Sequence, residues 1–271
     1  MDSKMKSNKG SDNIKKIKNK KANFDDQMDL WVGYWRCNLH RFAKDLGVSL
    51  KLFQKILIFM MDAFPMFTYV ASRGTGKSFL IALYAIMKCI LHPNLLVVIS
   101  SATKGQAIMM IKQYVQFFND EYPLIGNEIS AIRTNPQAPE VTFKNGSKIE
   151  AVTASDNARG HRTHLLILEE YAIMKKSIID SVLTKFGTTP RQPPFLSLPE
   201  YSDYPTEPIR EIYISSARYK SEWGWTHVKG YFKSMIKKYL YPKVIYQNYI
   251  LGYFQAIGAC HFILNYLTKR K

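Results

Sequence analysis

The feature that most constrains this chain is a short apolar run that passes through a glycine turn directly into a long apolar segment. The run "MFTYVAS" ends at residue 72, "RGTGKS" supplies two glycines, and "FLIALYAIMKCILH" continues until Pro93. A buried strand that leads through a tight turn into a helix opens a β-α-β unit, in which strands lie parallel and helices pack on the sheet. We therefore expect an α/β fold.

Similar apolar runs recur downstream and extend this expectation to a whole sheet. They are "LLVVIS" (95–100), "HLLILEEY" (164–171) and "EIYISSA" (211–217). Residues 28–63 and several segments between these runs place apolar residues three to four positions apart, which is typical of helices. "EVTFKNGSKIEAV" predicts a β-hairpin around its Asn-Gly pair. The pattern predicts a mostly parallel central sheet flanked by helices.

The glycine turn predicts a phosphate-binding loop. It matches the pattern G-x-x-x-x-G-K-[ST] except at the first position, where Ala71 stands. The backbone N–H groups of such a loop, a helix N-terminus and a lysine together bind nucleotide phosphates, and glycines keep the approach open. The alternative is a glycine-rich turn without a ligand. The predicted nucleotide-binding residues of the loop are Ala71, Ser72, Arg73, Gly74, Thr75, Gly76, Lys77 and Ser78.

Two adjacent carboxylates, Glu169 and Glu170, follow the third apolar run. The carboxyl ends of parallel strands meet at one edge of a sheet, so we expect both near the phosphate loop. In P-loop ATPases the first acid holds Mg²⁺ together with the hydroxyl of the loop, and the second polarises the attacking water. We therefore predict Ser78 and Glu169 as metal-binding and Glu170 as catalytic. Asp is commoner than Glu in the first position, so Glu169 departs from the usual pattern. The alternative interpretation is an ordinary pair of surface acids.

The charge of the chain favours an acidic partner. Its 38 Lys and Arg against 21 Asp and Glu give a formal net charge of +17, which favours nucleic acid over a membrane surface. Residues 1–23 contain eight lysines and predict a disordered basic tail, yet the rest still carries about +11. Three separated cysteines without zinc-ligand spacing favour a reducing compartment, and no apolar run is long and uncharged enough to span a membrane.

With these residues in place, the chain resembles the ATPase half of a tailed-bacteriophage terminase large subunit, a DNA-packaging motor, over residues 30–240. "ASRGTGKS" is similar to the loop variant of that family, in which a small residue replaces the first glycine and an arginine enters the loop. "LKLFQKIL" resembles its adenine-recognition element, and "SSATKGQA" the segment after its second strand. "SDNARGHRTHLLILEEYA" carries an Arg-Gly-x-Arg stretch before the acidic strand, and "YISSAR" stands where its coupling motif stands.

The resemblance implies roles for further residues. Gln54 would read the adenine edge, Arg73 would be an arginine finger for the ATP of its own chain, and Arg159 is the rival, reaching the ATP of a neighbour. Ser215 and Ser216 would sense the γ-phosphate and couple hydrolysis to movement. Other interpretations stay open: a polar helix residue for Gln54, a phosphate contact without catalytic effect for Arg73, a salt bridge or DNA-phosphate contact for Arg159, and ordinary strand-end hydroxyls for the serines.

The resemblance also implies an overall activity. It is ATP-driven translocation of double-stranded DNA into procapsids by a P-loop NTPase of the additional-strand type, with ATP and Mg²⁺ as cofactors. The implied partners are double-stranded DNA, the portal ring of the procapsid, a small terminase subunit and sister subunits in a ring, with no membrane. The implied location is the host-cell cytoplasm. The alternatives are a helicase-like nucleic-acid-dependent ATPase and an inactive nucleotide-binding or DNA-binding fragment.

Three parts are expected along the chain. Residues 1–23 form the tail, residues 24–240 the terminase-like ATPase domain, and residues 241–271 a segment of uncertain structure. That last segment contains no Asp or Glu, so it lacks the carboxylates of a two-metal nuclease. We expect the chain to end before a nuclease domain and to lack the endonuclease activity of the family.

Overall fold

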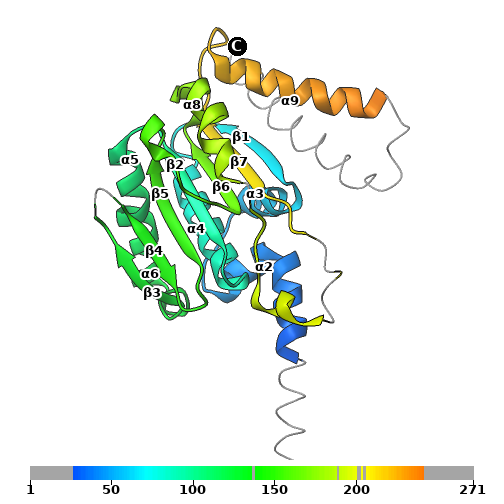
Figure 1. Cartoon of the computed structure of the whole chain (residues 1–271). Coiled ribbons are helices and arrows are strands. Elements are labelled where there is room, and N and C mark those ends of the chain that lie inside the picture. The colour runs from blue at the N-terminus through cyan, green and yellow to red at the C-terminus, as the bar shows by residue number, and fades with distance from the viewer. Residues whose placement is uncertain (1–26, 136–137, 188, 200–202, 204–205, 241–271) are drawn as a thin grey trace, which may run out of the picture.

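A computed structural model of the chain describes residues 27–135, 138–187, 189–199, 203 and 206–240 (Figure 1). The predicted basic tail, residues 1–23, and the segment 241–271 lie outside the described residues. None of the described helices combines the length and the apolar character needed to cross a bilayer.

Seven strands form one sheet in the order β1-β7-β6-β2-β5-β4-β3 (Figure 1). The first five strands in this order (β1, β7, β6, β2 and β5) run parallel. The last two, β4 and β3, continue the sheet with antiparallel pairing. This arrangement confirms the predicted α/β fold, and β7 is the additional strand between the phosphate-loop strand β1 and the acidic strand β6. The strands are β1 (Met66–Ala71), β2 (Leu96–Ser101), β3 (Ile129–Arg133), β4 (Glu140–Phe143), β5 (Lys148–Thr153), β6 (Leu165–Glu169) and β7 (Arg210–Ser216).

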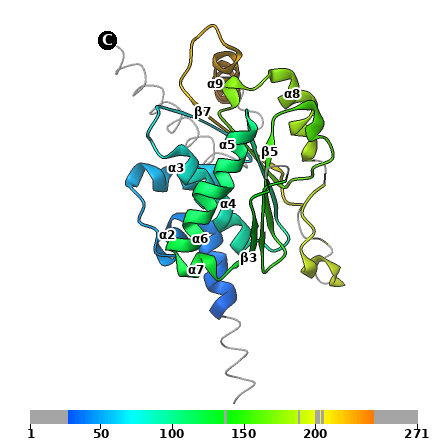
Figure 2. The same ribbon diagram turned by 90° about the vertical axis from the view of Figure 1, so that its left-hand side faces the viewer.

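Helices cover both faces of the sheet, as the edge-on view in Figure 2 shows. The central helix of one face is α4 (Lys77–Leu91), whose residues 80–87 are all buried, as expected for a helix apolar on all sides. Its neighbours on that face are α2 (Leu39–Asp45), α3 (Leu52–Ala63), α5 (Lys104–Met109), the π-helical turn Met110–Val115, α6 (Gln116–Glu121) and α7 (Pro123–Gly126). The other face carries the 3-10 turn Tyr171–Ile173, α8 (Lys176–Ser181), the 3-10 turn Leu183–Phe186 and the start of α9 (Trp223–Leu240).

One local prediction needs correction, and one strand was missed. The helical pattern of residues 28–63 is realised as three helices, at 27–37, α2 and α3. The first break is at Asn38, the N-cap of α2, and the second follows a turn at Gly47, whose φ is +91°. Strand β3 was not predicted from the sequence, because three of its five side chains are exposed and its apolar residues do not alternate. The predicted hairpin is confirmed: β4 and β5 pair antiparallel across a turn in which Gly146 has a φ of +82°.

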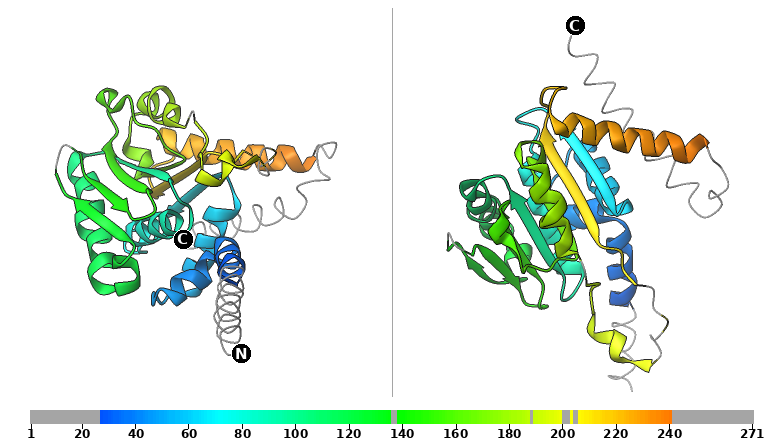
Figure 3. Two further views of the ribbon diagram at one scale, coloured as in Figure 1. Left: turned by 60° about the horizontal axis from the view of Figure 1, so that its bottom comes forward. Right: turned by 45° about the horizontal axis from the view of Figure 1, so that its top comes forward.

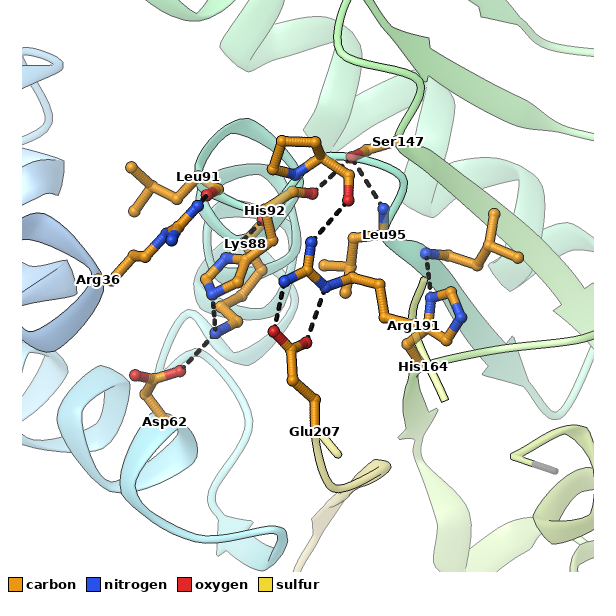
Figure 4. A network of polar contacts seen from close by, with 12 residues as sticks. Arg36, Asp62, Lys88, Leu91, His92, Leu95, Ser147, His164, Arg191 and Glu207 are labelled. Carbon is orange, nitrogen blue, oxygen red and sulfur yellow. Dashed lines mark hydrogen bonds and ion pairs between the residues drawn. The ribbon is translucent and has the colours of Figure 1, made fainter. Parts of the chain in front are cut away.

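A buried polar network ties the proline-rich segment 187–209 to the amino-end edge of the parallel strands (Figure 4). Arg191, only 4% exposed, donates to both carboxylate oxygens of Glu207 and to the carbonyl of Pro93 at 2.8 Å. Beside it Lys88 contacts Asp62 at 2.9 Å. This network lies at the edge of the sheet opposite the predicted site, so it anchors the long connection away from the phosphate loop.

Candidate functional site

The predicted site residues gather at the carboxyl edge of β1, β7, β6 and β2. Parallel register places Ala71 beside Ser216, and Glu169 beside Ser101 on the next strand. The right-hand view of Figure 3 shows β1 and β7 lying side by side toward this edge. The sheet therefore brings four separate stretches of sequence to one place.

The phosphate loop itself adopts the backbone that its glycines permit. Gly74 and Gly76 have φ values of +78° and +75°, in the left-handed region that favours glycine. Gly76 is also the N-cap of α4 (Lys77–Leu91), so the positive end of a 15-residue helix faces the loop. Thr75 Oγ1 and Lys77 Nζ donate to the carbonyl of Ser72, at 3.0 and 3.1 Å. The lysine is thus folded back over the loop, where a bound phosphate would lie.

Glu169 lies between the start of α4 and the end of β2. Its Oε1 accepts a hydrogen bond from the hydroxyl of Ser78, and its Oε2 accepts one from Ser101 Oγ at 3.2 Å. Burial raises the pKa of Glu169, while the two serine hydroxyls act in the opposite direction. A hydroxyl and a carboxylate oxygen in contact offer the hard oxygen donors that Mg²⁺ prefers, so Ser78 and Glu169 fit the predicted metal.

Glu170 is held by the additional strand. Its carboxylate accepts hydrogen bonds from the backbone N–H of Ser216 at 2.8 Å, from Ser216 Oγ at 2.7 Å and from Ser215 Oγ at 3.1 Å. Lys77 Nζ lies 3.7 Å from the same carboxylate. Burial alone would raise the pKa of Glu170, but the bonds from Ser216 and Ser215 and the charge of Lys77 outweigh it and lower the pKa. The carboxylate is therefore ionised at neutral pH.

Gln54 lies next to the loop, as the resemblance implied. A side chain placed at Gly76 would contact Gln54 Nε2 at 3.7 Å. The Oε1 atom of the same amide accepts a hydrogen bond from the backbone N–H of Lys51 at 2.9 Å and caps α3. One end of the amide is thus structural and the other faces the nucleotide side.

The two candidate arginines lie in different places. Arg73 is exposed within the loop and contacts no partner among the described residues. Arg159 is exposed on the other face of the sheet, where the next segment is fixed by a 2.7 Å contact from His161 Nδ1 to Glu150 of β5. In the sheet order, three strands separate β5 from the phosphate-loop strand β1. A pocket of about 370 Å³ beside Arg159 is lined by Arg159, Gly160, His161, Arg162, Ser181, Val182, Lys185 and Phe186.

Ser101 is the site residue that sequence reasoning missed. The apolar run 95–100 was expected to end one residue earlier, whereas β2 ends at Ser101. The signal available was the hydroxyl that follows a buried strand and faces the same edge as the acidic pair.

Comparison with known proteins gives one family match. Residues 68–204, about half of the chain, match the model described as "Terminase large subunit, T4likevirus-type, N-terminal". No curated protein sequence matches the chain.

Solved structures of similar fold were also found. The HK97 bacteriophage large terminase is 19% identical with a TM-score of 0.54, over 69% of this chain and 37% of that one. The chain thus spans well under half of that protein, and the likeness supports the fold. A variant ATPase domain of the Thermus phage P74-26 large terminase is 17% identical with a TM-score of 0.47, over 66% and 69% of the two chains. A thermophilic bacteriophage large terminase in complex with ADP is 11% identical with a TM-score of 0.44, over 61% and 39%.

Proposed function

The chain belongs to the family of terminase large subunits of T4-like-virus type, through the N-terminal region of that family, and on this premise we propose that it is the ATPase motor of a phage DNA-packaging machine. The observation that carries the proposal is the contact chain from Ser78 to Glu169 on one side and from Lys77 to Glu170 and Ser216 on the other. A phosphate loop, an acidic strand and the additional strand meet there, as ATP hydrolysis requires.

The loop binds the triphosphate through its backbone N–H groups and the N-terminus of α4. Lys77, which rests on Ser72 and contacts Ser216 Oγ at 3.2 Å, turns to the β- and γ-phosphates. The Nε2 end of Gln54, beside Gly76, donates to the adenine edge. These contacts position the γ-phosphate at the carboxyl edge of the sheet.

Ser78 and Glu169 hold the metal side of the site. These two residues would hold Mg²⁺, which would supply neutralisation of the phosphate charge. Glu169 keeps one carboxylate oxygen toward Ser78 and the other toward Ser101. As a ligand, the hydroxyl of Ser78 would replace its hydrogen bond to Glu169 by a bond to the metal.

We assign activation of the attacking water to Glu170, because its carboxylate is ionised and is held at the carboxyl edge of the sheet by Ser215 and Ser216. Arg73 belongs to the same loop as the nucleotide and serves as the finger of its own chain. Arg159 lies in the connection after β5, on the face of the sheet opposite α4, and we assign it to the ATP of a neighbouring subunit.

Ser215 and Ser216 connect this chemistry to movement. Both bind the Glu170 carboxylate and both end β7 (Arg210–Ser216), so a change at the γ-phosphate reaches β7 directly. We propose that this strand relays hydrolysis to the translocation of double-stranded DNA into procapsids in the host-cell cytoplasm. The partners are the portal ring, a small terminase subunit and sister subunits in a ring.

We further propose that residues 24–240 form the ATPase domain, preceded by a basic tail. Residues 241–271 contain no Asp or Glu, and we expect no metal-dependent cleavage of DNA by this 271-residue chain. Nicking or linearisation of a supercoiled plasmid by the purified chain in Mg²⁺ or Mn²⁺ would contradict this expectation.

The test of the proposed function is ATP turnover by the purified chain, with and without duplex DNA, beside Glu170→Gln. We expect turnover to fall at least about 100-fold in the variant while nucleotide binding persists, because a general base is removed and the loop is intact. Glu121→Gln, an exposed acid at the end of α6 (Gln116–Glu121), is the matched control and should retain full turnover.

Each alternative has its own result in this experiment. Nucleotide binding without turnover by the wild-type chain would favour an inactive fragment over a motor. Turnover accompanied by separation of the strands of a duplex would favour the helicase-like alternative.

A further inference from the structure

We propose that Ser101 is a positioning residue for the metal-binding carboxylate, an inference that rests on the proposed ATPase function. Ser101 ends β2 (Leu96–Ser101) and is the register partner of Glu169 on the neighbouring strand β6. Its side chain is 1% exposed, and its Oγ donates to Glu169 Oε2 at 3.2 Å. Register partners on parallel strands point to the same face of the sheet, so the backbone itself places these two side chains next to each other.

The need for such a residue follows from the identity of the acid. Glutamate has one more rotatable bond than aspartate, so its carboxylate must be fixed by contacts if it is to present one oxygen at a defined point. Glu169 is fixed from two sides: Ser78 at the start of α4 binds Oε1, and Ser101 at the end of β2 binds Oε2. With Oε2 held by Ser101, Oε1 stays directed at Ser78, the other predicted metal ligand.

Burial of a hydroxyl at this strand end is not enough to bring it into contact with the Glu169 carboxylate, as the neighbouring residue shows. Ser100 is 0% exposed, and its Oγ has no hydrogen-bond partner in the part of the chain that the structure describes. Successive side chains of a strand point to opposite faces, so Ser100 lies on the face away from α4 and Ser101 on the face that carries it. Ser100→Ala is therefore a matched control at the same strand end and at the same depth.

The experiment measures metal and nucleotide binding separately in the full-length chain. Mn²⁺ affinity of the ADP-bound protein is followed by electron paramagnetic resonance, and affinity for a fluorescent ADP analogue is measured in EDTA. In Ser101→Ala we expect about tenfold weaker Mn²⁺ binding, the usual loss when a residue that orients a metal ligand is removed. Metal-free nucleotide affinity should stay within about twofold, because the phosphate loop is untouched.

A second pair of variants tests whether Ser101 acts through Glu169. Aspartate is one methylene shorter and is expected to lose the reach to Ser101 while keeping the metal side. Ser101→Ala added to Glu169→Asp should therefore change Mn²⁺ affinity less than about twofold, which is the non-additivity of two residues that act on one contact. Ser101→Cys places a larger γ atom that is a weaker donor and should lose Mn²⁺ affinity as Ser101→Ala does; it serves if the alanine variant fails to fold.

Three results would overturn the inference. The first is wild-type Mn²⁺ affinity in a folded Ser101→Ala or Ser101→Cys. The second is an equal loss in Ser100→Ala, which would indicate a general packing effect. The third is a wild-type chain that binds no nucleotide; it would remove the proposed function as well, whereas the first two leave that function standing.

Discussion

Single residues decide whether the phosphate-binding loop can form at all. Gly74 and Gly76 hold φ values near +75°, which L-residues with a side chain reach only at a cost of about 1–2 kcal/mol. Space is not the constraint at Gly76, because an added Cβ would meet only Gln54 Nε2, at an ordinary 3.7 Å. The conformation alone makes glycine necessary there.

Gly76→Ala is therefore expected to destabilise the chain by about 1–2 kcal/mol through backbone strain, and to weaken ATP binding. Urea unfolding and a fluorescent-nucleotide titration measure the two effects. Gly105→Ala is the control: Gly105 lies in α5 (Lys104–Met109) with free space around it, so the change should be neutral or stabilising by up to about 1 kcal/mol. Equal destabilisation by both changes would contradict the argument from conformation.

The hydrogen bonds on Glu170 also predict a pH dependence. The pKa of Glu170 lies below its usual value of 4.5, so the native state favours the ionised form and gains stability that is present above the unfolded-state pKa. This contribution is lost as pH falls through the native pKa. Ser216→Ala removes one donor, so its loss of stability relative to wild type should be largest at neutral pH and shrink below about pH 4.

Denaturant unfolding of both proteins at a series of pH values measures this difference. A stability difference that stays constant from pH 7 down to the onset of acid unfolding would show that the hydroxyl of Ser216 acts independently of the charge on Glu170. Ser181→Ala, an exposed hydroxyl in α8 (Lys176–Ser181), should show no such trend.

Among the structural elements, the connection between the acidic strand and the additional strand is the longest, and one buried ion pair anchors it. The side chain of Arg191 is 2% exposed and that of Glu207 29%. The guanidinium also binds the carbonyl of Pro93, just after α4 (Lys77–Leu91). Removal of one partner leaves the other charge partly buried without compensation, which is more costly than an exposed pair is worth.

Arg191→Ala is expected to lower the free energy of unfolding by about 2–4 kcal/mol, somewhat less than for a fully buried pair because Glu207 keeps some contact with water. Arg133→Ala breaks a pair in which the arginine side chain is 70% exposed, and should cost less than about 1 kcal/mol. Thermal and urea unfolding of the two variants gives the comparison. Similar losses in both would show that burial does not set the strength of these pairs.

The elements that were predictable from sequence are those whose surroundings are uniform. Strands β2, β6 and β7 are mostly buried runs, in which one environment acts on most residues. Strand β1 was expected to be buried, but it is an edge strand in which only Tyr69 is buried, and its apolar run and the glycine pattern after it made it predictable. Strand β3 (Ile129–Arg133) was not predictable, since pairing with β4 fixes it while most of its side chains face water. The contact between Ser101 and Glu169 depends on the order of strands in the sheet, which no local pattern encodes.

At the scale of the whole molecule, the two candidate arginines lie at different parts of the sheet, and the proposed function assigns them different roles. Arg73 lies in the loop after β1, and Arg159 lies next to a segment that is held to β5, which three strands separate from β1. One chain can therefore present a phosphate loop and, at a distance, an arginine for another chain. A ring of sister subunits would bring the two together.

Mixing variants distinguishes an arginine that acts within its own chain from one that acts on a neighbour. Arg159→Ala and Lys77→Ala are each expected to lose ATP turnover alone, and an equimolar mixture should recover part of it, because intact loops meet intact arginines at mixed interfaces. A mixture of Arg73→Ala and Lys77→Ala should show no more ATP turnover than the two variants show separately. An Arg73 that acts on the ATP bound by its own chain cannot act on the ATP bound by another chain. Recovery by Arg73→Ala but not by Arg159→Ala would reverse the assignment.

The register of the parallel strands limits how such a chain can change in evolution. Ala71 with Ser216 and Ser101 with Glu169 are side-by-side pairs, and a one-residue insertion inside a strand would turn every following side chain to the opposite face. Insertions and deletions are therefore tolerated in connections such as residues 187–209. Inside the strands they would displace the side chains of the site. Sequences that have drifted far apart are then expected to differ in length mainly between strands, and to remain alignable at the strand ends.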